Sequence, residues 1–127
     1  MRVKGISWVG IGTDHYADTL RLLTDVMGLQ IEAEGEQQAL LRVGNGQQIE
    51  LFGRDGRGKR LNTPPTLAFE VDDVAAAREE LIAANVEIVG DIGSWNGHEW
   101  LYFRSADGYL FEVKSSPAFG QEGGSSP

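Results

Sequence analysis

Two glutamates, Glu50 and Glu112, hold matching places in two similar segments of the chain. The segments read Gln48-Ile49-Glu50-Leu51-Phe52 and Leu110-Phe111-Glu112-Val113-Lys114. A pair of carboxylates can hold a hard divalent cation whose remaining ligands are water, or it can bind a cationic ligand directly. If the two groups lie close together without a metal, repulsion and desolvation would favour protonation of one carboxyl group, which could then serve as a general acid or base.

The similarity between the two segments extends upstream and indicates an internal duplication. The stretch from Trp8 to Asp14 is echoed by the stretch from Thr66 to Asp72, and a helical pattern follows each. The offset is 58 residues from Trp8 to Thr66 and 62 residues from Glu50 to Glu112, so the second copy contains four extra residues. A period this long is typical of a duplicated half-domain rather than a solenoid repeat. We therefore predict one domain over residues 1–115, made of repeats 5–53 and 65–115 joined by a linker at 54–64, with a flexible tail at 116–127.

Each repeat has the pattern of a strand, a helix and three strands. Apolar periodicity and glycine positions predict the elements. In the first repeat these are a strand at 5–13, a helix at 17–27 capped by Asp14 and with Leu20, Leu23 and Met27 on one face, and strands at 29–34, 39–43 and 48–52. In the second they are a strand at 66–71, a helix at 73–84, and strands at 86–89, 98–104 and 109–115. The sequence thus predicts an α+β fold of two tandem βαβββ modules, with turns at Gly44-Asn45-Gly46 and Asp107-Gly108.

Composition excludes several classes of partner. The formal net charge is −8, which argues against nucleic acid and anionic membranes as partners because both require a basic surface. The chain has no cysteine, so it offers neither a disulfide nor a thiolate ligand. The residues from Met1 to Lys4 lead into a strand pattern without a long apolar stretch, so we expect no signal peptide, no transmembrane helix and a cytoplasmic location.

The order of elements resembles the vicinal oxygen chelate superfamily, which includes glyoxalase I, bleomycin resistance proteins and extradiol dioxygenases. The resemblance covers residues 5–115. It rests on Val9-Gly-Ile-Gly12, Asp25-Val-Met-Gly-Leu29, Ile49-Glu-Leu-Phe52, Phe69-Glu-Val-Asp-Asp-Val74 and Asp107-Gly-Tyr-Leu-Phe-Glu-Val113. It implies that the strands form a curved mixed sheet that shapes a cup, with the helices outside.

Strand alternation then predicts which side chains face the cup. Leu67, Phe69 and Val71 form the apolar face that packs under a helix, so Thr66, Ala68 and Glu70 face the cup. The same alternation gives the predicted ligand-binding set, which consists of Trp8, Gln48, Glu50, Phe52, Thr66, His98, Trp100, Tyr102, Arg104 and Glu112.

The resemblance also locates a metal site and casts doubt on it. Metal-dependent members take a His or comparable ligand from the first strand of each module and a Glu from the last, which here are the positions of Trp8, Thr66, Glu50 and Glu112. An indole has no lone pair to donate and a threonine hydroxyl is a poor ligand, so we expect no cofactor. The alternative is a divalent metal (Zn, Ni, Mn or Fe) held by Glu50, Glu112 and His98.

Tyr102 stands ten residues before Glu112, a spacing found in extradiol dioxygenases between a catalytic tyrosine and a ligand glutamate. The resemblance therefore implies Tyr102 and Glu112 as catalytic candidates, with a pocket-lining role for Tyr102 as the favoured alternative.

Three functions remain open at this point. The favoured one is binding of a small aromatic or cationic molecule in the cup without the usual metal, as in bleomycin resistance proteins, with a homodimer as the expected assembly. The second is a metal-dependent lyase, isomerase or dioxygenase that uses Glu50 and Glu112 with altered partners. The third is an enzyme-derived domain that serves only in interaction or regulation.

Overall fold

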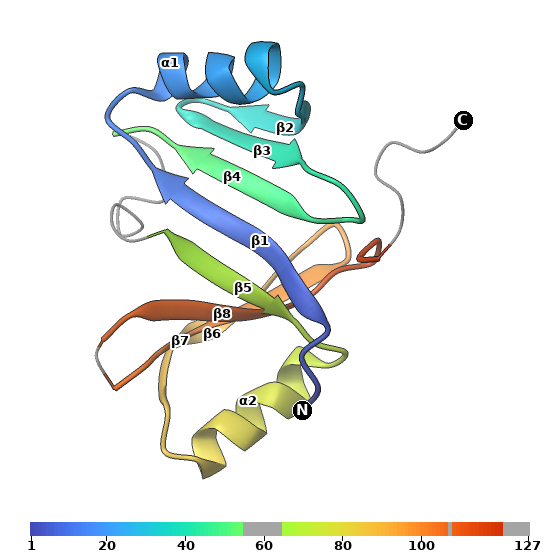
Figure 1. Cartoon of the computed structure of the whole chain (residues 1–127). Coiled ribbons are helices and arrows are strands. Elements are labelled where there is room, and N and C mark those ends of the chain that lie inside the picture. Colours follow the sequence, from blue (N-terminus) through green and yellow to red (C-terminus); the bar gives the residue numbers. More distant parts are fainter. Residues whose placement is uncertain (55–64, 107, 121–127) are drawn as a thin grey trace. The chain divides into compact units, whose positions relative to one another are not determined.

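The computed structural model describes residues 1–54, 65–106 and 108–120, and it shows the predicted order of elements twice (Figure 1). The first half contains β1 (Gly5–Gly12), α1 (Tyr16–Arg21), η1 (Leu22–Val26), β2 (Gln30–Gly35), β3 (Gln38–Arg42) and β4 (Gln48–Phe52). The second half contains β5 (Thr66–Glu70), α2 (Val74–Ala83), β6 (Glu87–Trp95), β7 (His98–Arg104) and β8 (Leu110–Ser115). The predicted fold class is confirmed. Most of the predicted linker, Asp107 of the second predicted turn and residues 121–127 of the predicted tail lie outside the described residues.

The chain forms two compact units, which we describe separately. Of the described residues, the first module holds 8–54, 65–66 and Gly120, and the second module holds 1–7, 67–106 and 108–119. The N-terminal residues therefore group with the second repeat, although they precede the first. The backbone N–H of Lys4 donates to the carbonyl oxygen of Glu70 at 2.9 Å, and the Lys4 ammonium lies 2.7 Å from Asp72. This contact lowers the pKa of Asp72, chiefly through the hydrogen bond from Lys4.

The first module is a four-stranded sheet in the order β2-β3-β4-β1, with β1 parallel to β4 and the other pairs antiparallel. Leu23 of η1 packs with Ala39 and Leu41 of β3, and Leu20 and Ile49 border this cluster. Because side chains alternate along a strand, the residues on either side of Ile49, namely Gln48 and Glu50, point to the face away from the helix. The turn at Gly44-Asn45-Gly46 is confirmed, with Asn45 and Gly46 at φ values of 53° and 78°.

The helix of the first module differs from the prediction in its second half. It starts as α1 but continues as a π-helix, η1, and its N-cap is His15 rather than Asp14. A π-turn adds a residue to each turn and rotates the following side chains around the axis. Leu23 keeps its buried place, whereas Met27, predicted on the same inward face, is 61% exposed.

The second module is a sheet in the order β5-β8-β7-β6, with β5 parallel to β8. Its core joins α2 to one face of the sheet and consists of Val71, Val74, Ala77, Leu81, Leu101 and Val113. Phe111 lies between Phe69 and Phe103 on this face, at ring distances of 5.9 and 5.8 Å. Strand β6 is longer than predicted and reaches Trp95, because Asn96 and Gly97 adopt the positive φ values of a tight hairpin turn.

None of the helices in the described ranges is both long and apolar enough to span a membrane.

The phenol of Tyr16 should make the stability of the first module depend on pH in the alkaline range. It borders the core, and burial together with the negative charge of Glu34 raises the pKa of its phenol. A raised pKa means that folding favours the neutral phenol, so this contribution is present below the unfolded pKa of about 10 and is lost as the pH rises through the folded value. We expect the melting temperature of the wild type to fall more steeply above pH 10 than that of Tyr16→Phe. Parallel thermal melts across this pH range would check this, and identical slopes would contradict it.

Candidate functional site

Glu50 of β4 is held on the polar face of the first module by two side chains from neighbouring strands. The indole Nε1–H of Trp8 on β1 donates to Glu50 Oε1 at 2.9 Å. The amide of Gln38 on β3 donates to Glu50 Oε2 at 2.7 Å. Glu50 is the register partner of Gly10 on β1 and of Leu40 on β3, so both donors reach it diagonally from two residues away. Each carboxylate oxygen thus has a protein donor.

Both groups that contact the oxygens of Glu50 are neutral N–H donors. A partly buried carboxylate needs hydrogen bonds to offset its lost hydration, and Trp8 and Gln38 supply two. The indole nitrogen of Trp8 can only donate a hydrogen bond, so Trp8 contacts Glu50 directly. A metal ligand at this position would instead bind the same cation as Glu50. Each oxygen of Glu50 keeps a further lone pair, which leaves the carboxylate able to accept a donor from a ligand.

The other predicted residues of the first module share this face but are nearly closed to solvent. Trp8 is 5% exposed and Phe52 is 6% exposed. The amide of Gln48 donates to Glu32 at 3.3 Å. In this structure Trp8 therefore orients Glu50 and offers little ring surface on which a ligand could stack.

Sequence reasoning missed Gln38, the second donor to Glu50. Gln38, Leu40 and Arg42 alternate along β3 with the buried Ala39 and Leu41, so the alternation rule that selected Gln48 and Glu50 would also have selected Gln38. It was missed because the family resemblance directs attention to the first and last strands of each module.

Glu112 of the second module faces Tyr102 across the pair β7 and β8. The two residues are register partners, and on the same face Trp100 pairs with Lys114 and Arg104 with Leu110. Glu112 is buried, at 3% exposure, and Tyr102 is partly buried. The predicted catalytic candidates Tyr102 and Glu112 are thus neighbours on the sheet.

Arg104 lies near the end of β7, where its contacts are with its own hairpin and with β6. It donates to the carbonyl oxygen of Gly108 at 2.9 Å and lies 3.8 Å from Glu87. Thr66, the first residue of β5, is buried at 2% exposure. The contacts of Arg104 with Gly108 and Glu87 give it a structural role in the hairpin.

His98 is the first residue of β7 and does not pair with Glu112. It precedes Tyr102, the register partner of Glu112, by four residues, which is about 13 Å along an extended strand. Its ring instead stacks with that of Trp95, at a centroid distance of 6.0 Å and an interplanar angle of 22°. This separation counts against a metal shared by His98 and Glu112. Within the described ranges, no group of three or more His, Asp or Glu side chains is arranged to hold a metal ion.

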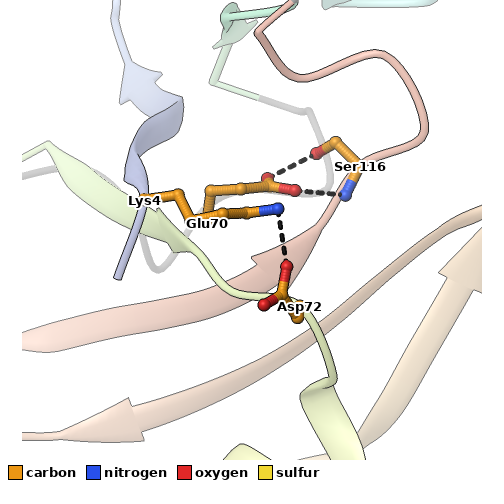
Figure 2. Close-up of polar contacts among 4 residues, drawn as sticks. All are labelled: Lys4, Glu70, Asp72 and Ser116. Carbon is orange, nitrogen blue, oxygen red and sulfur yellow. Dashed lines mark hydrogen bonds and ion pairs between the residues drawn. The ribbon is translucent and has the colours of Figure 1, made fainter. Parts of the chain in front are cut away.

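Glu70 of β5 is a buried carboxylate with an evident structural use (Figure 2). It is 1% exposed, and its two oxygens accept hydrogen bonds from the backbone N–H and the hydroxyl of Ser116, at 2.7 and 2.9 Å. Ser116 directly follows β8, so Glu70 fixes the start of the predicted tail.

Comparisons with known proteins agree with this fold. The model of the glyoxalase/bleomycin resistance protein/dioxygenase superfamily matches residues 5–113. No curated protein matches the chain. Methylmalonyl-CoA epimerase from Mycobacterium tuberculosis has a similar structure, with a TM-score of 0.71 and 24% identity over 91% of this chain and 90% of that one.

Two further solved structures are similar. The Mn(II)-bound glyoxalase from Novosphingobium aromaticivorans gives a TM-score of 0.74 at 22% identity, and the match covers 99% of this chain but 42% of that one. A superfamily member from Vibrio splendidus 12B01 gives 0.63 at 16% identity, over 87% and 97%. At these identities the likeness shows the fold alone, but the family model spans most of the sequence. The chain belongs to the glyoxalase/bleomycin resistance protein/dioxygenase superfamily.

Proposed function

We propose that this protein binds a small cationic or aromatic molecule, and that Glu50 serves this binding without the divalent metal used by many members of its superfamily. The observation that carries the proposal is the hydrogen bond from Trp8 Nε1 to Glu50 at 2.9 Å. It puts an obligate donor at the position where a metal-dependent relative would have a ligand. With Gln38 on the other oxygen, Glu50 is oriented before any ligand arrives.

The chemistry of Glu50 favours a cation with hydrogen-bond or close-contact capacity. A fixed carboxylate accepts a charge-assisted contact with little further loss of side-chain freedom. The net charge of −8 would also attract a cation over a distance. We propose that the protein acts in the cytoplasm.

Binding of benzylammonium, a cation with both an aromatic ring and N–H donors, tests this proposal when followed by NMR. The chain has three tryptophans, so the spectrum contains three indole N–H signals, and Trp8→Phe identifies the one bonded to Glu50. We expect the cation to shift the Trp8 signal. Glu50→Gln keeps the shape of the side chain and removes its charge, which should weaken binding by about tenfold or more, the usual value of a charge-assisted contact.

Glu36→Gln is the matched control for Glu50→Gln, because Glu36 is an exposed acid in the turn between β2 and β3 of the same module. It should bind the cation as the wild type does. Equal binding by Glu50→Gln, or a Trp8 signal that does not respond, would contradict the proposal.

A second candidate is a metal-dependent lyase, isomerase or dioxygenase. The observation that favours it is the register pairing of Tyr102 with Glu112, which puts a phenol beside a buried carboxylate. In this candidate Glu50 and Glu112 would be the surviving ligands for Zn, Ni, Mn or Fe, and Tyr102 would move a proton. The place of His98 four residues away from Tyr102 disfavours it as the third ligand.

We also propose a homodimer. Light scattering of the purified protein should then give about twice the chain mass of 13.8 kDa. A mass of one chain at micromolar concentration would contradict this part of the proposal.

A further inference from the structure

The second module presents aromatic rings at the hairpin between β6 and β7. Trp95 is the last residue of β6 and His98 is the first of β7, and the two are register partners, so their side chains share a face. Their rings stack at 6.0 Å and 22°. Trp95 is nevertheless 46% exposed, far more than a tryptophan used only for packing.

Trp100 extends this aromatic surface along the same face. Its register partner is Gly93, and Gly93 is two residues before Trp95 on β6. A methyl group added at Gly93 would lie 2.5 Å from the indole of Trp100, so this ring lies directly over the glycine. Because Gly93 has no side chain, the Trp100 ring can lie across β6, two residues before Trp95.

The hairpin that carries these rings is held in place. Asn96 and Gly97 form its turn, with φ values of 49° and 82°. Gly97 lies against Pro117. The Cγ atom of Pro117 is 3.5 Å from the point where a Cβ atom at position 97 would lie. Pro117 follows Ser116, which Glu70 binds through two hydrogen bonds (Figure 2). The turn is thus supported by a segment that is itself fixed, and the rings need little ordering when a ligand arrives.

We propose that Trp95, His98 and Trp100 form a stacking site for a planar aromatic ring system. Stacking needs a flat ring with one accessible face and a rigid mount, and the hairpin supplies both. A side chain that is half exposed and stacked on one side by His98 is open to a second ring on the other. This site extends the proposed small-molecule binding to the second module and uses neither Glu50 nor Trp8.

NMR titration with quinoline, which is uncharged near neutral pH, tests the site. Trp8→Phe, Trp95→Phe and Trp100→Phe assign the three indole N–H signals. We expect quinoline to shift the signals of Trp95 and Trp100 and to leave that of Trp8 unchanged, whereas cyclohexanol, which has neither an aromatic ring nor a charge, should leave Trp95 unchanged. This pattern separates the two proposals, because loss of the Trp8 response to cations would overturn only the role of Glu50.

Variants of Trp95 make the test quantitative. Trp95→Leu keeps an apolar side chain and loses the flat ring, so it should bind quinoline about tenfold more weakly, the value typical of one aromatic stack. His98→Ala should weaken binding in the same direction. Tyr109→Ala, which removes another exposed ring of the same module, is the control and should bind as the wild type does. Unchanged binding in Trp95→Leu, or a quinoline response confined to Trp8, would overturn the proposal.

Discussion

Glu70→Ala is expected to lower the free energy of unfolding by about 2 to 4 kcal/mol, because it removes a buried acceptor and leaves two donors without a partner. The carboxylate is 1% exposed and accepts both the N–H and the hydroxyl of Ser116. Truncation leaves these partly buried donors without their acceptor and opens a small cavity beside them. Urea denaturation followed by circular dichroism would measure the loss.

Ser116→Ala and the double variant separate the hydrogen bonds from the cavity. Ser116→Ala removes only the hydroxyl donor and should cost about 1 kcal/mol. The double variant should be more stable than the sum of the single losses predicts, because both changes remove the same contact. Asp72→Ala is the matched control in the same cluster, since Asp72 is an exposed acid that pairs with Lys4, and it should change stability little. A loss in Glu70→Ala no larger than that of Asp72→Ala would contradict this account.

Gly93→Ala is the second large effect that we expect. The added methyl group would lie 2.5 Å from the Trp100 ring, well inside contact distance, so the indole must move or β6 must bend. Overpacking of this kind costs about 1 to 3 kcal/mol. It should also shift the indole N–H signal of Trp100 and weaken quinoline binding, which links the packing of Trp100 to the proposed stacking site.

Gly35→Ala is the control for Gly93→Ala. Gly35 is also a strand residue, the last of β2, its φ is not in the positive range, and a methyl group there meets no atom within 4 Å. It should not destabilise the protein, and it should raise the free energy of unfolding by about 0.4 to 1 kcal/mol because alanine restricts the unfolded chain. If the two variants are equally stable and the Trp100 signal stays in place, Trp100 does not lie over Gly93 in solution.

The fold could be predicted from the sequence because the duplication presents the same strand, helix and turn patterns twice. Glycines, turns and alternating strands appeared twice, and the β7 prediction at 98–104 matches the observed strand His98–Arg104. The polar face of each sheet could be predicted too, because apolar residues such as Leu41 and Leu101 mark the face that packs against the helix. Alternation then leaves Glu50 and Glu112 on the other faces without any knowledge of the structure.

Three features could not be predicted from these signals. The π-helix at Leu22–Val26 has no sequence signature, so Met27 was assigned to the wrong face. The grouping of Met1–Ser7 with the second module depends on contacts between residues far apart in the sequence, such as the hydrogen bond from Lys4 N–H to Glu70. The hydrogen bonds between Glu70 and Ser116 join residues 46 positions apart, and no local pattern encodes them.

One further error had a signal that was available. Asn96-Gly97 is a strong predictor of a two-residue hairpin, and it would have extended the sixth strand to Trp95. Interpreting this stretch as a connection hid the pairing of Trp95 with His98. The pairing places His98 in an aromatic stack, away from the level of Glu112, and this weakens the alternative ligand set.

Metal content of the purified protein tests the central claim most directly. The protein would be loaded separately with Zn, Ni, Mn and Fe(II), desalted and measured by elemental analysis, with Glu50→Ala and Glu112→Ala in parallel. We predict no retained metal above the background of the two variants, because the indole N–H of Trp8 donates to Glu50 and supplies no lone pair to a metal. One metal ion per chain in the wild type, lost in either variant, would contradict it and favour the metal-dependent enzyme.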